Sequence, residues 1–106
     1  MITDTHAHLF WDGLGQDLDG VLERARAAGV GHIVVVGTDL KSSRAAFELC
    51  RGRPELSPTA GIHPHDAAGI DAAARAEIEK LCALPECVAV GETGLDYFKE
   101  FSPRAA

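Results

Sequence analysis

Residues 32–37 read His32-Ile33-Val34-Val35-Val36-Gly37, and their core is an unbroken run of β-branched side chains. A hydrophobic run without alternation is typical of a strand that is buried on both faces of a parallel sheet. Parallel strands need a crossover connection between them, and this connection is usually a helix. Apolar residues at helical spacing flank the run on both sides, at 18–28 and at 42–51. The stretch therefore predicts βαβ units.

The same alternation of strand and helix extends along the whole chain. The expected strands cover residues 2–9, 32–37, 56–62 and 87–90, and the expected helices cover 18–28, 42–51 and 71–83. Ser102 and Pro103 predict the start of a further helix at 101–104. Strands that recur every ~25–30 residues, with a helix between each pair, are typical of parallel βαβ units.

Four such units fit either a small open sheet or half of a (β/α)8 TIM barrel. A closed barrel needs about 250 residues, whereas this chain has 106. We therefore expect a single domain, 1–106, of the α/β class, whose parallel βαβ units form the N-terminal half of such a barrel and leave it incomplete.

The composition limits the function classes. The chain has 46% hydrophobic residues, its N-terminus lacks the pattern of a secretory signal, and its longest apolar run is too short to span a membrane. We therefore expect a cytoplasmic protein without membrane contact. A net charge of −6 argues against a basic patch for nucleic acid, but not against a phosphate-bearing substrate that is held through divalent cations.

Three polar residues at strand ends point to a metal site. His6 and His8 end the first expected strand, where side chains at i and i+2 leave the same face, and Glu92 follows the fourth strand between two small residues. In parallel α/β folds, the C-terminal strand ends form the active-site face. Imidazole nitrogens and a carboxylate that converge there suit Zn²⁺, Mn²⁺ or Mg²⁺. Asp4 shares their face but lies lower, so it is expected to support the ligands rather than to bind metal.

Other residues near the strand ends have two interpretations. His63 and His65 either cap a turn stiffened by Pro64, or they contact the substrate or hydrogen-bond the ligands. Asp39 either caps the following helix or takes part in function. His32 starts its strand at the opposite end and is interpreted as structural.

Three further residues are weaker candidates. Trp11 lies beside the histidine pair and either shapes the rim of the pocket or covers the barrel edge. Asp96 and Tyr97 follow Glu92 closely and are candidates for substrate binding or for support of the ligands.

Four motifs resemble one known family along the whole chain, in the same order and at suitable separation: Asp4-Thr5-His6-Ala7-His8-Leu9, Val36-Gly37-Thr38, Gly61-Ile62-His63-Pro64-His65 and Gly91-Glu92-Thr93-Gly94-Leu95-Asp96-Tyr97. The family is that of the TatD-related metal-dependent deoxyribonucleases. The resemblance implies an amidohydrolase-like (β/α)8 barrel with two divalent metal ions. It implies that His6 and His8 hold one metal, that Glu92 bridges both, and that metal-bound water hydrolyses phosphodiester bonds in DNA, in some members as a 3′→5′ exonuclease.

The chain also departs from the family pattern. The family takes two further histidine ligands and a water-activating aspartate from later strands, which are expected beyond Ala106. We therefore expect these 106 residues to hold at most one metal well, to be inactive or nearly so by themselves, and to associate with themselves through the open barrel edge.

Two alternatives remain from the sequence. One is a related metal-dependent amidohydrolase, esterase or phosphatase, because a His-x-His pair on the first strand is shared among such barrels. Many amidohydrolases bridge their metals with a modified lysine on strand four, so Glu92 favours the deoxyribonuclease-like branch. The other alternative is a non-catalytic half-barrel fragment.

Overall fold

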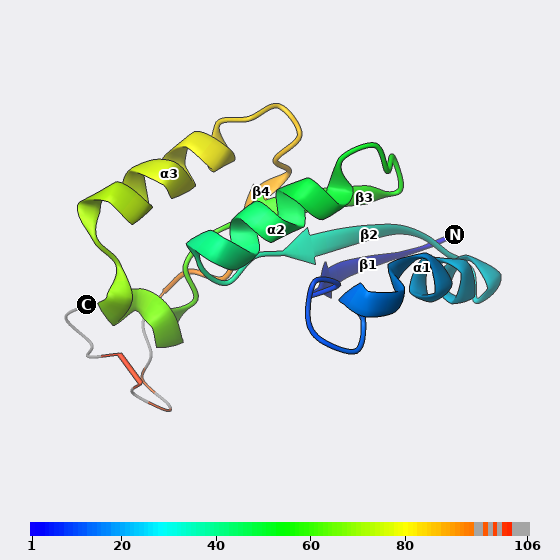
Figure 1. The fold of residues 1–106 in the computed structure, drawn as a ribbon, viewed down its shortest axis with the longest axis horizontal. Coiled ribbons are helices and arrows are strands. Elements are labelled where there is room, and N and C mark those ends of the chain that lie inside the picture. Colours follow the sequence, from blue (N-terminus) through cyan, green and yellow to red (C-terminus); the bar gives the residue numbers. More distant parts are fainter. Residues whose placement is uncertain (95–96, 98, 100, 103–106) are drawn as a thin grey trace.

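The structure, a computed structural model, contains one four-stranded parallel sheet and describes residues 1–94, 97, 99 and 101–102. The strands lie in the order β1-β2-β3-β4, so β1 and β4 form its two edges. Their bounds are Ile2–Ala7, Val30–Val36, Leu56–Ala60 and Ala89–Val90. The helices α1 (Leu18–Ala27), α2 (Leu40–Cys50) and α3 (Ala72–Cys82) connect consecutive strands (Figure 1). This confirms the predicted succession of parallel βαβ units.

The expected bounds differ from the observed ones mainly at the strand ends. The first and third strands stop two residues earlier than predicted, and β4 is only two residues long. Two short 3₁₀ helices, η1 (Gly15–Asp17) and η2 (Pro64–Gly69), lie in loops where the sequence pattern predicted none. Of the helix start expected at 101–104, residues 103–104 lie outside the described residues, and residues 101–102 form a bend.

The hydrophobic core lies between β2 and the two helices that flank it. Ile33 and Val35 of β2 pack with Leu22 of α1 and with Ala46 and Cys50 of α2. Burial of these apolar side chains is the main favourable contribution to folding. The helices therefore cover one face of the sheet and leave the strand ends accessible.

The prediction that residues 32–37 are buried on both faces is only partly correct. Ile33 and Val35 are buried beneath the helices, but Val34 on the opposite face is half-buried. Val36, further along this second face, is buried beside Gly91. The second face is therefore covered at the C-terminal strand ends, where Gly91 follows β4, and more open at Val34.

The structure bears on the interpretations of Asp39 and His32. The carboxylate of Asp39 accepts a hydrogen bond of 2.7 Å from the backbone N–H of Ser42, and the Ser42 hydroxyl accepts one from the backbone N–H of Asp39. This reciprocal capping box explains why α2 begins at this point and gives Asp39 a capping role. Nε2 of His32 lies 2.7 Å from the hydroxyl of Ser57 on β3, which agrees with its structural interpretation.

No helix within the described part of the chain is long and apolar enough to cross a membrane.

Candidate metal centre

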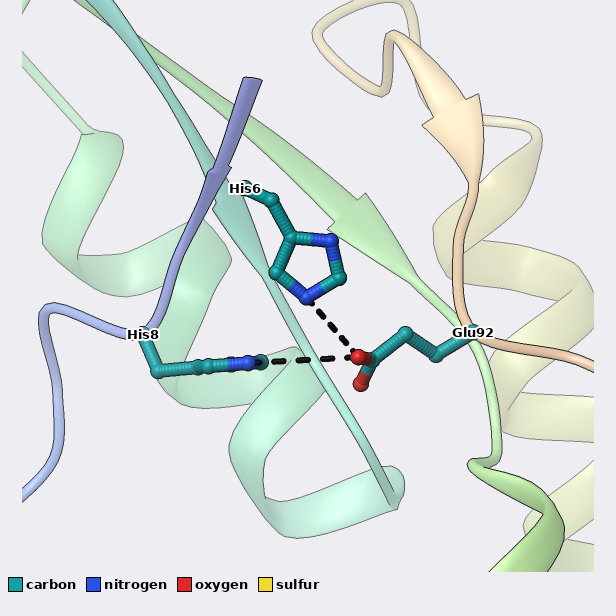
Figure 2. Close-up of side chains that lie close together, drawn as sticks. All are labelled: His6, His8 and Glu92. Atoms are coloured by element: carbon teal, nitrogen blue, oxygen red, sulfur yellow. Dashed lines mark ion pairs between the residues drawn. The ribbon is translucent and has the colours of Figure 1, made fainter. Parts of the chain in front are cut away.

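The ligands predicted from the sequence meet at the C-terminal ends of the two edge strands. His6 is the second-to-last residue of β1, His8 directly follows that strand, and Glu92 lies two residues after β4. In a flat sheet, three steps of about 4.8 Å would separate the edges by about 14 Å. The side chains nevertheless touch, because they lean toward one another over the ends of β2 and β3 (Figure 2).

One carboxylate oxygen of Glu92 faces both imidazoles. Oε1 of Glu92 lies 2.8 Å from Nε2 of His6 and 4.0 Å from Nε2 of His8. One ligand atom from each of the three residues falls within 4.8 Å of the other two. This grouping of two nitrogens and one oxygen is of the size and chemistry that a divalent cation requires.

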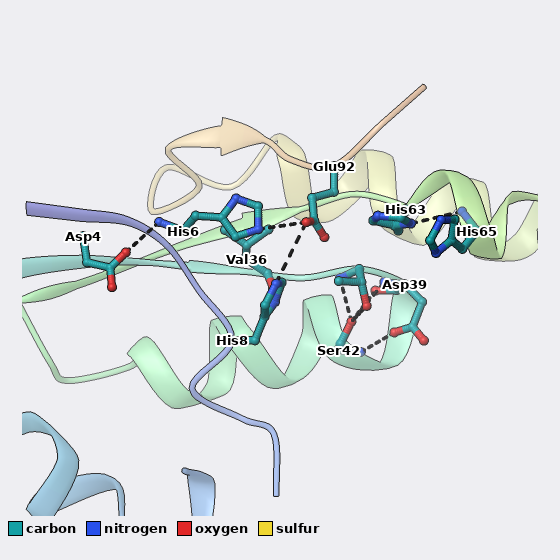
Figure 3. Close-up of polar contacts among 10 residues, drawn as sticks. Asp4, His6, His8, Val36, Asp39, Ser42, His63, His65 and Glu92 are labelled. Carbon is teal, nitrogen blue, oxygen red and sulfur yellow. Dashed lines mark hydrogen bonds and ion pairs between the residues drawn. The ribbon is translucent and has the colours of Figure 1, made fainter. Parts of the chain in front are cut away.

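A backbone hydrogen bond sets the orientation of His8. Its Nδ1 lies 2.7 Å from the carbonyl oxygen of Val36, which only accepts hydrogen bonds (Figure 3). Nδ1 therefore carries the proton of the neutral ring, and the lone pair of Nε2 points to the Glu92 side. Such a support behind a histidine is characteristic of metal ligands.

Asp4 supports the backbone of His6 rather than its ring. Oδ1 of Asp4 accepts a hydrogen bond of 3.0 Å from the backbone N–H of His6. The pairing of β1 with β2 is irregular between Asp4 and Ala7, where β1 has one additional residue. Because a bulge re-aims the side chains around it, this contact helps to fix the direction in which His6 leaves the strand.

The backbone of Glu92 is held in an unusual conformation. Its φ is +43°, and it is the only non-glycine residue with positive φ in the described part of the chain. Strain of this kind persists where the surrounding structure requires it, and it concentrates at functional sites. The preceding residue, Gly91, is part of that surrounding structure. A Cβ at residue 91 would lie 2.7 Å from Oγ1 of Thr59, so glycine lets the chain pass close to β3 just before Glu92.

The second carboxylate oxygen of Glu92 indicates that the site fits a cation. Oε2 is buried and has no hydrogen-bond partner among the described residues. Burial of a carboxylate oxygen without a donor is costly unless a cation or another donor compensates it. Nε2 of His6, Nε2 of His8 and Oε1 of Glu92 form a donor set that suits one divalent cation, and the buried Oε2 is free to serve as a further donor.

The two later histidines line a pocket next to this group. The pocket has a volume of about 400 Å³ and is lined by His8, Trp11, Thr38, His63, His65, Asp66, Glu92 and Phe101. Nδ1 of His63 accepts a hydrogen bond of 3.0 Å from the backbone N–H of His65, so His63 caps η2. The capping interpretation therefore holds for His63, and both histidines also line the pocket. Because Nδ1 is an acceptor, the proton of the neutral His63 ring lies on Nε2.

The remaining candidates differ in position. Trp11 lines the pocket beside His8. This position agrees with the interpretation that Trp11 shapes the rim of the pocket. Tyr97 is exposed and is not among the residues that line the pocket. Asp96 lies outside the described residues. Sequence reasoning did not single out Asp66 or Phe101, since neither belongs to a strand-end histidine or carboxylate pattern.

Comparisons with known proteins identify relatives of this chain. The family model described as TatD related DNase matches residues 3–106. A protein named 3′-5′ ssDNA/RNA exonuclease TatD from Escherichia fergusonii is 41% identical over 99 residues, which are 93% of this chain and 38% of the relative. The protein of that name from Citrobacter rodentium is 45% identical over 87 residues, 82% of this chain and 33% of the relative.

A solved structure has the same fold. The crystal structure of YjjV, a TatD homologue from Escherichia coli K12, superposes with a TM-score of 0.84 at 29% sequence identity, over 92% of this chain and 38% of the other. The chain thus spans little more than a third of the length of these relatives. The four parallel strands form part of a (β/α)8 barrel that is incomplete in these 106 residues, as predicted. By its sequence and its fold, the chain belongs to the family of TatD related DNases.

Proposed function

We propose that this chain supplies the first part of a divalent-metal site that hydrolyses phosphodiester bonds in DNA. The observation that carries the proposal is the Glu92 carboxylate, whose Oε1 faces two imidazoles and whose Oε2 is buried without a partner among the described residues. A carboxylate with two differently engaged oxygens is suited to bridge two cations. The names of the relatives, which refer to exonucleases of single-stranded DNA and RNA, support a nucleic-acid substrate.

In this proposal, each ligand has a separate task. His6 and His8 would hold one cation, and the Glu92 carboxylate would contribute to that cation and to a second one. Mg²⁺, Mn²⁺ and Zn²⁺ all suit such a mixed nitrogen and oxygen site. When bound, divalent cations stabilise the charge of a phosphodiester and activate water as the nucleophile. These 106 residues hold at most one such cation well, because Glu92 is their only proposed ligand for the second.

His63 and His65 are proposed to contact the substrate. Both line the pocket that contains Glu92, and Nε2–H of the neutral His63 ring is a donor because Nδ1 is already an acceptor. The non-bridging oxygens of a phosphodiester accept hydrogen bonds from such donors. Asp96 and Tyr97 stay weaker candidates for the same task, and Asp4 supports the ligands through the His6 backbone.

The first prediction concerns activity. The protein encoded by the complete reading frame that contains residues 1–106 is expected to shorten 5′-labelled single-stranded DNA when Mg²⁺ or Mn²⁺ is added, and to stop when EDTA removes the cation. The 106-residue chain is expected to bind the cation but to act at less than about one hundredth of that rate, because two-metal hydrolysis needs both cations. Gel electrophoresis of the labelled DNA measures both rates.

Other outcomes of this experiment discriminate between the proposed function and its alternatives. Hydrolysis of p-nitrophenyl esters or amides, without cleavage of DNA, would support a related amidohydrolase or esterase instead. Cleavage of p-nitrophenyl phosphate alone would support a phosphatase. Efficient metal-dependent cleavage of DNA by the 106-residue chain would contradict the proposed inactivity of this part. Cation binding without turnover of any substrate by the complete protein would support a non-catalytic role.

The second prediction concerns assembly. Ile2 on β1, together with Val88 and Val90 around β4, exposes apolar side chains at the two edges of the sheet. Unpaired edges with apolar side chains favour association with another chain. The 106-residue chain is therefore expected to elute from size-exclusion chromatography as a species larger than a monomer. A compact monomer that melts cooperatively would contradict this expectation.

A further inference from the structure

The pocket beside the candidate metal centre lacks the usual means of holding nucleic acid. No lysine or arginine is among the described residues that line it, and the whole chain has a net charge of −6. Contacts to phosphates by cationic side chains normally supply most of the affinity for nucleic acid. Lys99 lies nearby, with its Nζ 5.6 Å from the centroid of the Phe101 ring that lines the pocket. Because a single lysine replaces few of these contacts, binding at this pocket has to rely mainly on the cations and on the bases themselves. Stacking on an aromatic side chain is the common way to bind unpaired bases.

Trp11 is placed where such stacking is possible. Its indole stacks on the His8 ring, with centroids 4.1 Å apart and planes 16° from parallel. Trp11 nevertheless stays 52% exposed, and it lines the pocket together with Glu92. The indole is covered on one side by the ring of His8 and is approached by Phe10, whose ring centroid lies 6.3 Å away with its plane at 88°. Its exposed part offers an apolar surface directly beside the candidate metal centre.

The backbone that carries the indole, and the ring on which the indole stacks, are both held in position before any ligand binds. The backbone N–H of Trp11 donates a hydrogen bond of 3.1 Å to the carbonyl of His8. The carbonyl of Trp11 accepts hydrogen bonds from the N–H groups of Leu14 and Gly15, at 3.1 and 2.9 Å. The His8 ring beneath the indole is in turn fixed by the carbonyl of Val36. A platform fixed in this way loses little conformational entropy when a base stacks on it.

We propose that Trp11 is the stacking platform for an unpaired nucleobase of the strand whose phosphate lies at the candidate metal centre. This inference rests on the proposed function and adds to it a residue that selects single-stranded substrates. Bases in a duplex are already stacked on their neighbours, whereas an unpaired base has a free face. Stacking is also tolerant of sequence, so Trp11 would select for strandedness and not for a particular base.

The test compares the binding of an oligonucleotide that carries its bases with the binding of the same oligonucleotide without them. Trp11 is the only tryptophan of the chain, so intrinsic fluorescence reports on this one indole. A short oligo(dT) and the same oligonucleotide with abasic sites are titrated into the 106-residue chain in the presence of Mg²⁺. Oligo(dT) is expected to quench the fluorescence with saturation, and the abasic form is expected to leave it unchanged. The affinity for oligo(dT), measured by fluorescence anisotropy, should exceed that for the abasic form by roughly 5- to 150-fold.

Two variants separate stacking from a merely structural role. Trp11→Ala is expected to bind oligo(dT) no better than the abasic form, whereas Trp11→Phe retains an aromatic ring and recovers part of the difference. If Trp11 only supported His8, Trp11→Ala would weaken the binding of Mn²⁺ in calorimetry and lower the affinity for both oligonucleotides alike.

Several results would overturn the inference. They are equal affinities of the unmodified chain for the two oligonucleotides, no binding of either, or a Trp11→Ala variant that still prefers oligo(dT). These results are independent of the DNA-cleavage assay for the proposed function. If the complete protein cleaves DNA while both oligonucleotides bind equally, only the role of Trp11 is wrong. If base-dependent binding persists without cleavage, only the proposed reaction is wrong.

Discussion

Glu92→Gln is expected to abolish tight binding of a divalent cation to this chain. The change keeps the size of the side chain but removes the charge that both imidazoles face and leaves an amide nitrogen in place of one oxygen. Loss of a group that only supports a metal ligand costs 10- to 100-fold in affinity, so loss of the shared ligand itself is expected to cost at least about 100-fold. Isothermal titration calorimetry with Mn²⁺ measures the effect.

A matched control separates this effect from loss of a carboxylate in general. Glu23 is an exposed carboxylate on α1, and Glu23→Gln makes the same chemical change away from the strand ends. It is expected to bind Mn²⁺ like the unmodified chain. Both variants are expected to melt in EDTA near the temperature of the unmodified chain. Retention of full Mn²⁺ affinity by Glu92→Gln, or by His6→Ala, would show that the ligand assignment is wrong.

Much of the fold could be predicted because its signals are local. The β-branched run of β2 and the helical spacing of Leu18, Val21 and Leu22 in α1 depend only on neighbouring residues. The half-buried state of Val34 could not be predicted, since it depends on how far the sheet is covered by the rest of a barrel. The short length of β4 has a similar origin, because β4 pairs through only two residues with β3.

The site could be predicted in its members but not in its geometry. Placement at strand ends was enough to select His6, His8 and Glu92, because parallel strands bring their C-terminal ends to the same edge. The support of His8 by the Val36 carbonyl could not be predicted, since every residue has a carbonyl and only the fold selects one. The positive φ of Glu92 likewise follows from its neighbours in space.

Cysteines illustrate the same limit. Cys50 is buried, and this burial raises the pKa of its thiol to about 12 against the lowering effect of Arg53. Cys50 is therefore expected to be unreactive near neutral pH. Cys82, the last residue of α3, and Cys87, two residues before β4, are free thiols that are only partly buried. Residue type alone does not distinguish these environments.

Gly61→Ala is expected to disrupt the candidate metal centre without changing any ligand. A Cβ at Gly61 would lie only 1.8 Å from the carbonyl oxygen of Gly91. This oxygen belongs to the backbone, so it cannot rotate away as the end of a side chain could. The strands must separate at the point where the N–H of Gly91 donates to the carbonyl of Ala60. Overpacking of this kind costs about 3 kcal/mol at the upper end of its usual range.

The displacement is transmitted to Glu92 because this residue directly follows Gly91. Since a shift of about 1 Å at a constrained site can cost as much as 100-fold, Gly61→Ala is expected to weaken Mn²⁺ binding at least about tenfold. Gly69→Ala is the matched control, because a Cβ there has no atom within 4 Å. Calorimetry with Mn²⁺ and thermal unfolding followed by circular dichroism measure the two effects. Gly61→Ala with unchanged melting and unchanged Mn²⁺ affinity would show that the close approach of β3 and β4 does not position Glu92.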